Sequence, residues 1–216
     1  KIAEYATDIQ YSYAVTPNIF RVDPAVAADP SEPFQTNPPK AFEKIDEVNM
    51  GSSAGSVQFT SGSANEIWHE ISANQNILSQ QYDLLDGAFP ASGEEAVLIV
   101  SRDRKISDSV LYALGVRDVE ELNAILRDPK KEQENTSQTS AFSFDELKNM
   151  EFKLIANTDF YAKENGQWHD LRKDTEAMKN VVKNGSEIRI VGIVMPKEDS
   201  SITNQGIGYT TDLSAA

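Results

Sequence analysis

Cysteine is absent from this chain of 216 residues. Without thiols, the chain can form no disulfide, no thiolate metal site and no cysteine nucleophile. Long hydrophobic runs are also absent, since the longest spans about five or six residues and a membrane-spanning helix needs about 20. The chain begins with Lys1 rather than Met. We therefore expect a piece of a longer protein, so the missing membrane segment says nothing about the whole gene.

Positive charge is scarce. The chain has 20 lysine and arginine residues against 34 aspartate and glutamate residues, which gives a formal charge of −14 and a pI near 4.5. Such a surface repels the phosphates of nucleic acids and the headgroups of anionic lipids, so neither is expected as a partner. Hydrophobic residues at 39% and charged residues at 25% are typical of a soluble globular protein long enough to bury a core.

Residues 82–115 form the stretch around which the rest of the chain is organised. Gly87 is expected to take a positive φ in an acidic turn. The apolar run 96–100 predicts a strand that is buried on both faces. A helix then begins at Ser107 or Asp108 and ends at Gly115 as its C-cap.

The remaining pattern mixes strands, hairpins and short helices. Strands are expected at residues 9–15, 19–22, 150–156 and 188–194, and helices at 65–71, 74–81, 118–128, 143–149 and 174–184. A hairpin over 160–168 is expected to turn at Asn165 and Gly166. Because there is no regular βαβ rhythm, the sequence predicts an α+β fold. The predicted fold forms one domain over residues 1–216, or it divides into a lobe 1–82 and a lobe 83–216.

Other segments predict irregular structure. Residues 24–39, rich in proline, alanine and aspartate, are interpreted as a surface loop rather than a strand or helix. Residues 130–140 are polar and are interpreted as a loop too. Residues 51–63 are rich in glycine and serine, with a short edge strand at 56–60. Residues 206–209, with the sequence GIGY, are interpreted as a turn or bulge.

Two short motifs resemble catalytic signatures, and neither is persuasive. His69 and Glu70 begin like a zinc-protease helix, but Ala73 stands where a second histidine is required. Ser53 lies in a segment, GSSAG, that matches a nucleophile elbow by letters. That motif needs a buried strand before it and a helix after it, and neither is expected here.

Neighbouring acidic and aromatic residues have ordinary explanations. The acidic pairs Glu94–Glu95, Asp83–Asp86 and Glu198–Asp199 are expected to lie on the solvated surface, because a chain so rich in carboxylates contains such pairs by chance. Most of the tyrosines and tryptophans are expected in the core. Trp168, beside the predicted hairpin turn, is the best candidate for an exposed aromatic side chain.

Five segments, in order, resemble the large extracytoplasmic domain of FtsX/MacB-type ABC transporter permeases. They are YDLLDGAFPASGEEAVLIV, ISDSVLYALGV, FSFDELKNMEFKLI, SEIRIVGIVMPKED and GIGYTTDL. Ala88 departs from the family pattern, in which a larger or basic residue is expected. The resemblance implies an α+β, MacB-like fold held between membrane helices.

The resemblance also implies a function without catalysis. The domain would relay ATP-driven movement at the extracellular face of a bacterial cytoplasmic membrane. Its partners would be its own transmembrane helices, a cytoplasmic ABC ATPase and an accessory surface protein or peptide. No catalytic, cofactor-binding or metal-binding residue is carried over. The alternative is a stand-alone cell-surface binding or adhesion module that uses the loops 24–39 and 130–140. A serine hydrolase built on Ser53 is the least favoured class.

Overall fold

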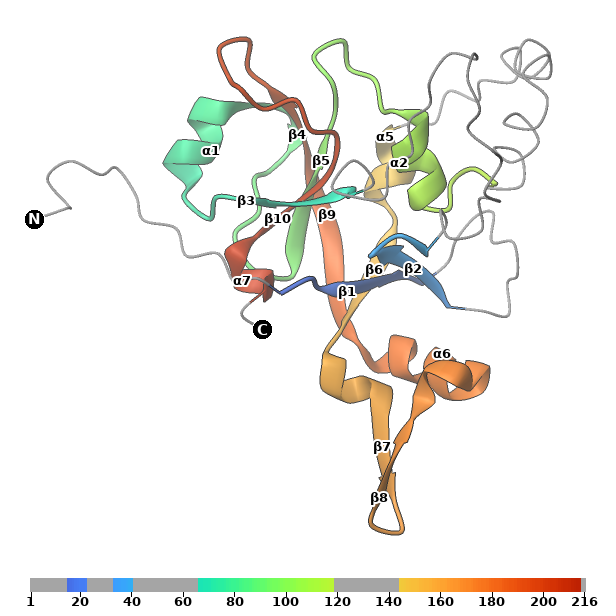
Figure 1. Ribbon diagram of the computed structural model, residues 1–216. Helices are drawn as coiled ribbons and strands as arrows, with labels where there is room; N and C mark the ends of the chain where they lie inside the picture. The colour runs from blue at the N-terminus through green and yellow to red at the C-terminus, as the bar shows by residue number, and fades with distance from the viewer. Residues whose placement is uncertain (1–14, 23–32, 41–65, 119–143, 215–216) are drawn as a thin grey trace, which may run out of the picture.

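The computed structural model describes residues 15–22, 33–40, 66–118 and 144–214. It contains an eight-stranded sheet with short helices against it and a separate two-stranded hairpin (Figure 1). This mixture of strands and short helices confirms the α+β class. The sheet contains β1 (Asn18–Arg21), β2 (Phe34–Asn37), β3 (Trp68–Ile71), β4 (Tyr82–Gly87), β5 (Glu95–Ile99), β6 (Glu151–Ile155), β9 (Ser186–Pro196) and β10 (Gly206–Thr210).

The strand order is β2-β1-β6-β9-β5-β10-β3, and β4 pairs with β9 beside this path. The sheet therefore includes strands from both sides of residue 82. Strands β5 and β9 are parallel, as are β3 and β10, whereas the other pairs are antiparallel. The helices are α1 (Gln75–Gln81), α2 (Asp108–Ala113), α5 (Phe144–Lys148), α6 (Thr175–Asn184) and α7 (Thr211–Ser214). None of the helices in the described ranges is long and apolar enough to cross a membrane.

Strand β5 is buried on both faces, as its apolar run predicts. Ala96 and Leu98 belong to a large cluster that includes side chains of α2 and α5. Val97 and Ile99 belong to a second cluster with Leu78 of α1. Alternate residues of a strand point to opposite faces, so this one strand contributes to both cores.

Strand β9 is long enough to take two neighbours on one edge. Its first residues pair with β6, and residues beyond Val191 pair with β4, while β5 pairs along the other edge. At the end of β4, Gly87 has a φ of +74° and lies opposite Gly192. A Cβ on Gly192 would lie 2.2 Å from the carbonyl oxygen of Ala88. Glycine is therefore required for this close approach of two backbones.

Strands β3 and β10 correct two predictions. The segment that carries Trp68 and Ile71 was expected to be helical, but it is a strand that pairs in parallel with β10. The GIGY segment was expected to be a turn or bulge, but it is the fully buried strand β10. A Cβ on Gly206 would lie 2.1 Å from the carbonyl oxygen of Ile67, so this glycine allows close packing inside the sheet.

Strand β2 corrects a third prediction, since residues 34–37 were expected to lie in a surface loop. The strand is polar, but its side chains have hydrogen-bond acceptors. The Thr36 hydroxyl donates to the backbone carbonyl of Ile19 at 3.2 Å, and the Asn37 amide donates to that of Pro17 at 2.8 Å. A polar segment can be buried in a sheet when its donors are satisfied in this way.

Other predicted elements are confirmed. Helices α1, α2, α5 and α6 lie where the periodicity places them, and Asn74 and Asp174 accept hydrogen bonds from backbone amides as N-caps. Gly115, after α2, has a φ of +66°. Several predictions fall outside the described residues: the strands in 9–14 and 56–60, the cap Asn65, the helix 118–128, the loop 130–140, the cap Ser143 and the motif with Ser53.

Candidate interaction surface

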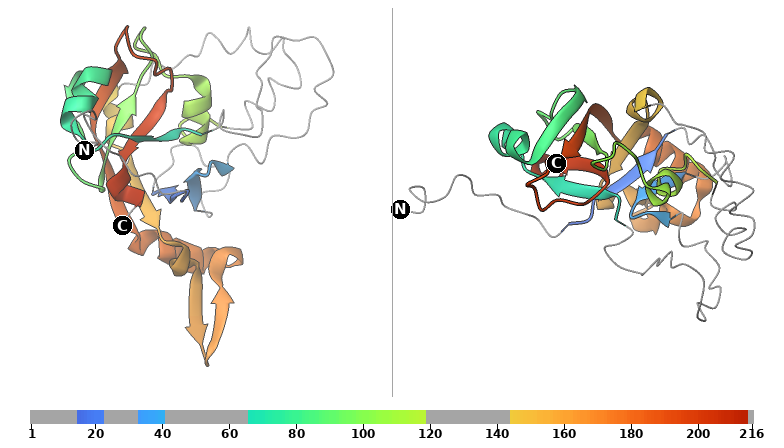
Figure 2. Two further views of the ribbon diagram at one scale, coloured as in Figure 1. Left: turned by 60° about the vertical axis from the view of Figure 1, so that its left-hand side comes forward. Right: turned by 90° about the horizontal axis from the view of Figure 1, so that it is seen from above.

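A hairpin with its adjoining helices projects from the sheet (Figures 1 and 2). We call residues 156–185 the arm. They contain β7 (Tyr161–Glu164), β8 (Gln167–Asp170), two short 3₁₀ helices at Asn157–Phe160 and Leu171–Lys173, and α6. The arm connects β6 to β9, which pair with each other through Leu154 and Ser186. The chain therefore leaves the sheet and returns to it at neighbouring positions.

A small hydrophobic cluster fixes the base of the arm to the sheet. Phe20 of β1 and Ile155 of β6 pack with Phe160, Met178 and Val182 of the arm. The rings of Phe20 and Phe160 meet edge to face with centroids 6.4 Å apart. Two-stranded hairpins are marginally stable alone. This cluster therefore supplies the packing that the projecting strands lack.

The hairpin turn follows the sequence prediction. Asn165 has a φ of +51° and Gly166 a φ of +85°. Positive φ at both central residues defines the turn that matches the twist of a two-residue hairpin, and Asn-Gly is the preferred pair for it. The predicted hairpin is confirmed, with its strands at Tyr161–Glu164 and Gln167–Asp170.

The two faces of the hairpin differ in chemistry. Directly paired residues share a face, and the face alternates along each strand. One face carries the pairs Tyr161–Asp170 and Lys163–Trp168, and the other carries Ala162–His169 and Glu164–Gln167. We call the first the aromatic face. Trp168 is 66% exposed, Tyr161 is 42% exposed, and the Lys163 ammonium lies 5.7 Å from the centroid of the indole.

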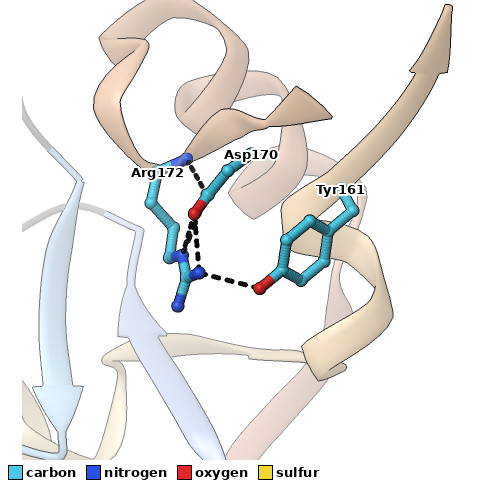
Figure 3. Close-up of polar contacts among 3 residues, drawn as sticks. All are labelled: Tyr161, Asp170 and Arg172. Carbon is cyan, nitrogen blue, oxygen red and sulfur yellow. Dashed lines mark hydrogen bonds and ion pairs between the residues drawn. The ribbon is translucent and has the colours of Figure 1, made fainter. Parts of the chain in front are cut away.

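Arg172 orders the end of the aromatic face nearest the sheet (Figure 3). Its Nε donates to Asp170 at 2.9 Å and its Nη2 donates to the same carboxylate at 2.6 Å. The Nη2 atom also donates to the hydroxyl of Tyr161 at 2.8 Å, and the guanidinium lies 5.4 Å from the centroid of that ring. One arginine thus ties the two hairpin strands together by a forked ion pair and a cation–π contact.

The Asp170 carboxylate is held ionised by these contacts. Hydrogen bonds from the Arg172 side chain, and next from its backbone N–H, lower the pKa of Asp170 to about 2. The same ion pair raises the pKa of Arg172. Asp170 and Arg172 therefore stay charged throughout the neutral pH range.

Charge is distributed unequally between the arm and the remainder of the chain. The arm has five lysine and arginine side chains and five carboxylates, so its net charge is zero and the remainder carries all of the −14. Within the hairpin, the aromatic face together with Arg172 carries two cations and one carboxylate, and the other face has Glu164. The aromatic face is therefore a small positive surface on a strongly acidic protein.

The other candidate residues are scattered. The His69 ring nitrogen Nε2 lies 3.0 Å from the backbone carbonyl oxygen of Gln205, so this ring has a hydrogen-bond partner within the sheet region. The carboxylates Asp83, Asp86, Glu94, Glu198 and Asp199 are exposed. Glu95 accepts a hydrogen bond from the backbone of Ala91 at 2.8 Å. Within the described ranges, no three histidine or acidic side chains are close enough to hold a metal ion.

Among the described aromatic residues, the expectation that Trp168 is exposed is confirmed, and so is the expectation that most of the tyrosines and tryptophans are buried. Trp68, Tyr82, Tyr112 and Tyr209 are buried, as expected. Tyr161 is the exception among the described tyrosines, since it lies on the aromatic face and is 42% exposed. Its contact with Arg172 depends on the course of a long side chain, which no short stretch of sequence shows.

Protein-family models, curated proteins and solved structures were compared with the chain, and none of them matches it. The family resemblance therefore rests on the five sequence segments alone.

Proposed function

We propose that this chain is a non-catalytic extracytoplasmic domain of an FtsX/MacB-like ABC transporter permease. It lies on the extracellular face of a bacterial cytoplasmic membrane and passes on movement that an ATPase drives from the other side. Its partners are its own transmembrane helices and that ATPase subunit. In this proposal, the domain has the MacB-like form of the α+β class.

The placement of the five resembling segments supports this proposal. They correspond to β4–β5, α2, α5–β6, β9 and β10–α7, which are central elements of the sheet and the helices packed on it. None of the five includes the arm. The resemblance is thus concentrated in the part of the chain that builds the sheet and the helices packed on it, and it does not extend to the arm.

The observation that carries the proposal is the course of strand β9. It starts at the base of the arm, where α6 ends, and runs into the middle of the sheet with β6, β4 and β5 paired along its edges (Figure 1). A strand that is hydrogen-bonded on both edges resists bending. Displacement of the sheet would therefore be passed to the arm as movement of a rigid body.

The first test is the full-length gene. We expect apolar segments of membrane-spanning length on both sides of this domain and an ATPase that co-purifies with the gene product. A gene product without membrane segments would contradict the proposal.

The second test uses the absence of cysteine from this domain. Gln167→Cys at the tip of the hairpin and Ser201→Cys in the sheet region are both exposed positions for a pair of fluorescent labels. In the full-length protein with its ATPase, we expect ATP to leave energy transfer between these two labels unchanged. ATP should change the transfer between Gln167→Cys and an acceptor dye in the membrane. An ATPase variant that binds ATP without hydrolysing it is the control.

The alternative function is a stand-alone surface binding or adhesion module. The exposed aromatic face favours it, because exposed Trp and Tyr side chains are common in binding surfaces. The same gene decides between the two, since an adhesin has a secretion signal and an anchor but no ATPase partner.

A further inference from the structure

We propose that the aromatic face of the hairpin docks into a pocket of a separate protein, and that this pocket is apolar inside and acidic at its rim. The residues that make the contact are Trp168, Lys163 and Arg172. The inference does not rest on the proposed function, because either a permease domain or an adhesion module can carry such a surface.

The composition of the face fits a protein-binding surface. Tryptophan, tyrosine and arginine are the residue types that contribute most often to binding free energy at protein interfaces. The hairpin presents Trp168, Tyr161 and Arg172 on one side of two short strands. The side chain of Arg172 is already fixed by Asp170 and Tyr161. Less rotational freedom is therefore lost when a partner binds.

The shape of the hairpin indicates that the partner supplies the cavity. Seven of the eight residues in β7 and β8 are exposed, the exception being Ala162, so the hairpin projects and is open on both sides (Figure 2). Small molecules bind mostly in concave sites. A projecting tryptophan instead needs a pocket in another macromolecule to bury its ring.

The positive charges of Lys163 and Arg172 favour a pocket with acidic residues at its rim. Lys163 lies over the Trp168 ring. Among the described residues, the Nη1 atom of Arg172 makes no hydrogen bond, because Nε and Nη2 donate the hydrogen bonds of this side chain. Carboxylates at the edge of the pocket can therefore approach each of these cations. Complementary charge of this kind speeds association and fixes the orientation of the partners.

Two other occupants fit less well. An anionic membrane would be repelled by the rest of the chain, which carries −14, and the hairpin offers one large apolar side chain to insert. A second copy of the chain would bring an equal negative charge against the first. Both remain outcomes that the experiment can detect.

The experiment begins with photo-cross-linking in the cell that carries the gene. Benzoylphenylalanine replaces Trp168 in one version of the full-length protein and Gln167, on the opposite face, in a matched control. We expect a protein adduct at position 168 that is absent at position 167. Because capture alone does not establish the contact, the captured protein is then purified and its affinity for the full chain is measured.

We expect Trp168→Ala to weaken this affinity by about 30-fold or more, as for an interface hot spot. Lys163→Glu should weaken it by about tenfold, because it places a negative charge against the acidic rim. The control variants Gln167→Ala and Glu164→Gln alter the opposite face and should change the affinity by less than about twofold. Trp168→Phe, which keeps an aromatic ring, should retain part of the affinity, and circular dichroism checks that each variant is folded.

Four results would overturn the proposal. The first is equal cross-linking at positions 168 and 167, and the second is an affinity that Trp168→Ala leaves unchanged. The third is a cross-linked product that consists of a second copy of this chain. The fourth is Trp168-dependent binding to vesicles of phosphatidylglycerol in place of a protein.

Discussion

The sheet and the arm are stabilised in different ways. In the sheet, β5 is paired on both edges and buried on both faces, with residues 96–99 fully inaccessible to solvent. In the arm, β7 and β8 have one neighbour each and are open to solvent on both faces. The arm relies on its turn, on the Arg172 contacts and on a small cluster at its base.

The two tryptophans of the chain illustrate this difference between the sheet and the arm. Trp68 is 3% exposed, meets Phe152 edge to face at 5.1 Å, and donates from its indole to the hydroxyl of Thr36 at 3.2 Å. Trp168 is 66% exposed and touches Lys163. The first ring contributes to folding through packing, whereas the second leaves its apolar area available for a partner. Four experiments test this difference.

The largest expected effect comes from truncating each tryptophan. Trp68→Ala should lower the free energy of unfolding by about 3–5 kcal/mol, because it leaves a cavity in the core. Trp168→Ala should change it by no more than about 0.5 kcal/mol. Urea denaturation followed by circular dichroism measures both. Similar losses of stability in the two variants would mean that Trp168 is packed against the rest of the protein and is not exposed.

Adding a methyl group to a glycine should also separate the two regions. Gly192→Ala should cost about 3 kcal/mol, since its Cβ would lie 2.2 Å from the carbonyl oxygen of Ala88 and the backbones of β4 and β9 would have to separate. A Cβ on Gly166 would meet nothing within 4 Å. Gly166→Ala should therefore cost only about 1 kcal/mol, from its positive φ.

The loss of stability in Gly166→Ala should be confined to the arm. Hydrogen exchange should show faster exchange at the β7 and β8 amides in Gly166→Ala, with the amides of β5 unchanged. Faster exchange throughout the sheet would contradict the separation of the two regions.

Alkaline pH should lower the stability of the sheet through the ionisation of Tyr82. Burial raises the pKa of Tyr82 to about 12, compared with about 10 in an unfolded chain. Because the folded-state pKa is raised, the contribution to stability is complete below pH 10 and is lost as the pH rises toward 12. Wild type should lose about 2 kcal/mol across this window that Tyr82→Phe does not lose. Parallel denaturation curves at several pH values provide the measurement.

Acidic pH should affect the arm, with the smallest effect of the four. The pKa of Asp170 is lowered to about 2. The contribution of its carboxylate to the stability of the arm is therefore present above the ordinary pKa of an aspartate and is lost as the pH falls toward 2. Titration of the Asp170 carboxyl carbon by NMR should show an inflection near pH 2. In Arg172→Ala, the inflection should move to about 4. An unchanged inflection would show that Arg172 does not hold the carboxylate in solution.

Local patterns predicted the elements whose structure is locally determined. The Asn165–Gly166 turn, the helix predicted over 174–184, the C-cap Gly115 and the apolar run of β5 all follow from a few neighbouring residues. The exposure of Trp168 followed as well, because the residue lies beside a tight turn.

Strands β2, β3, β4 and β10 escaped prediction, because each of them depends on a partner strand outside its own stretch of sequence. The apolar spacing of Trp68 and Ile71 fits one face of a helix, but the segment pairs with β10 near the other end of the chain. The glycines of β10 suggest a turn when considered alone, and only the neighbouring backbone of Ile67 shows why Gly206 is needed. Polar β2 becomes a strand because β1 lies beside it and accepts its hydrogen bonds.

The amino-acid sequence by itself determined the α+β class, the acidic surface, the central buried strand and the hairpin with its exposed tryptophan. These features depend on composition or on contacts between near neighbours. The tertiary structure alone decided the order of the strands, the sharing of one β9 edge by β6 and β4, and the gathering of Tyr161, Asp170 and Arg172 on the aromatic face. Pairing between distant strands and the course of a long side chain depend on the whole fold, which no short window of sequence contains.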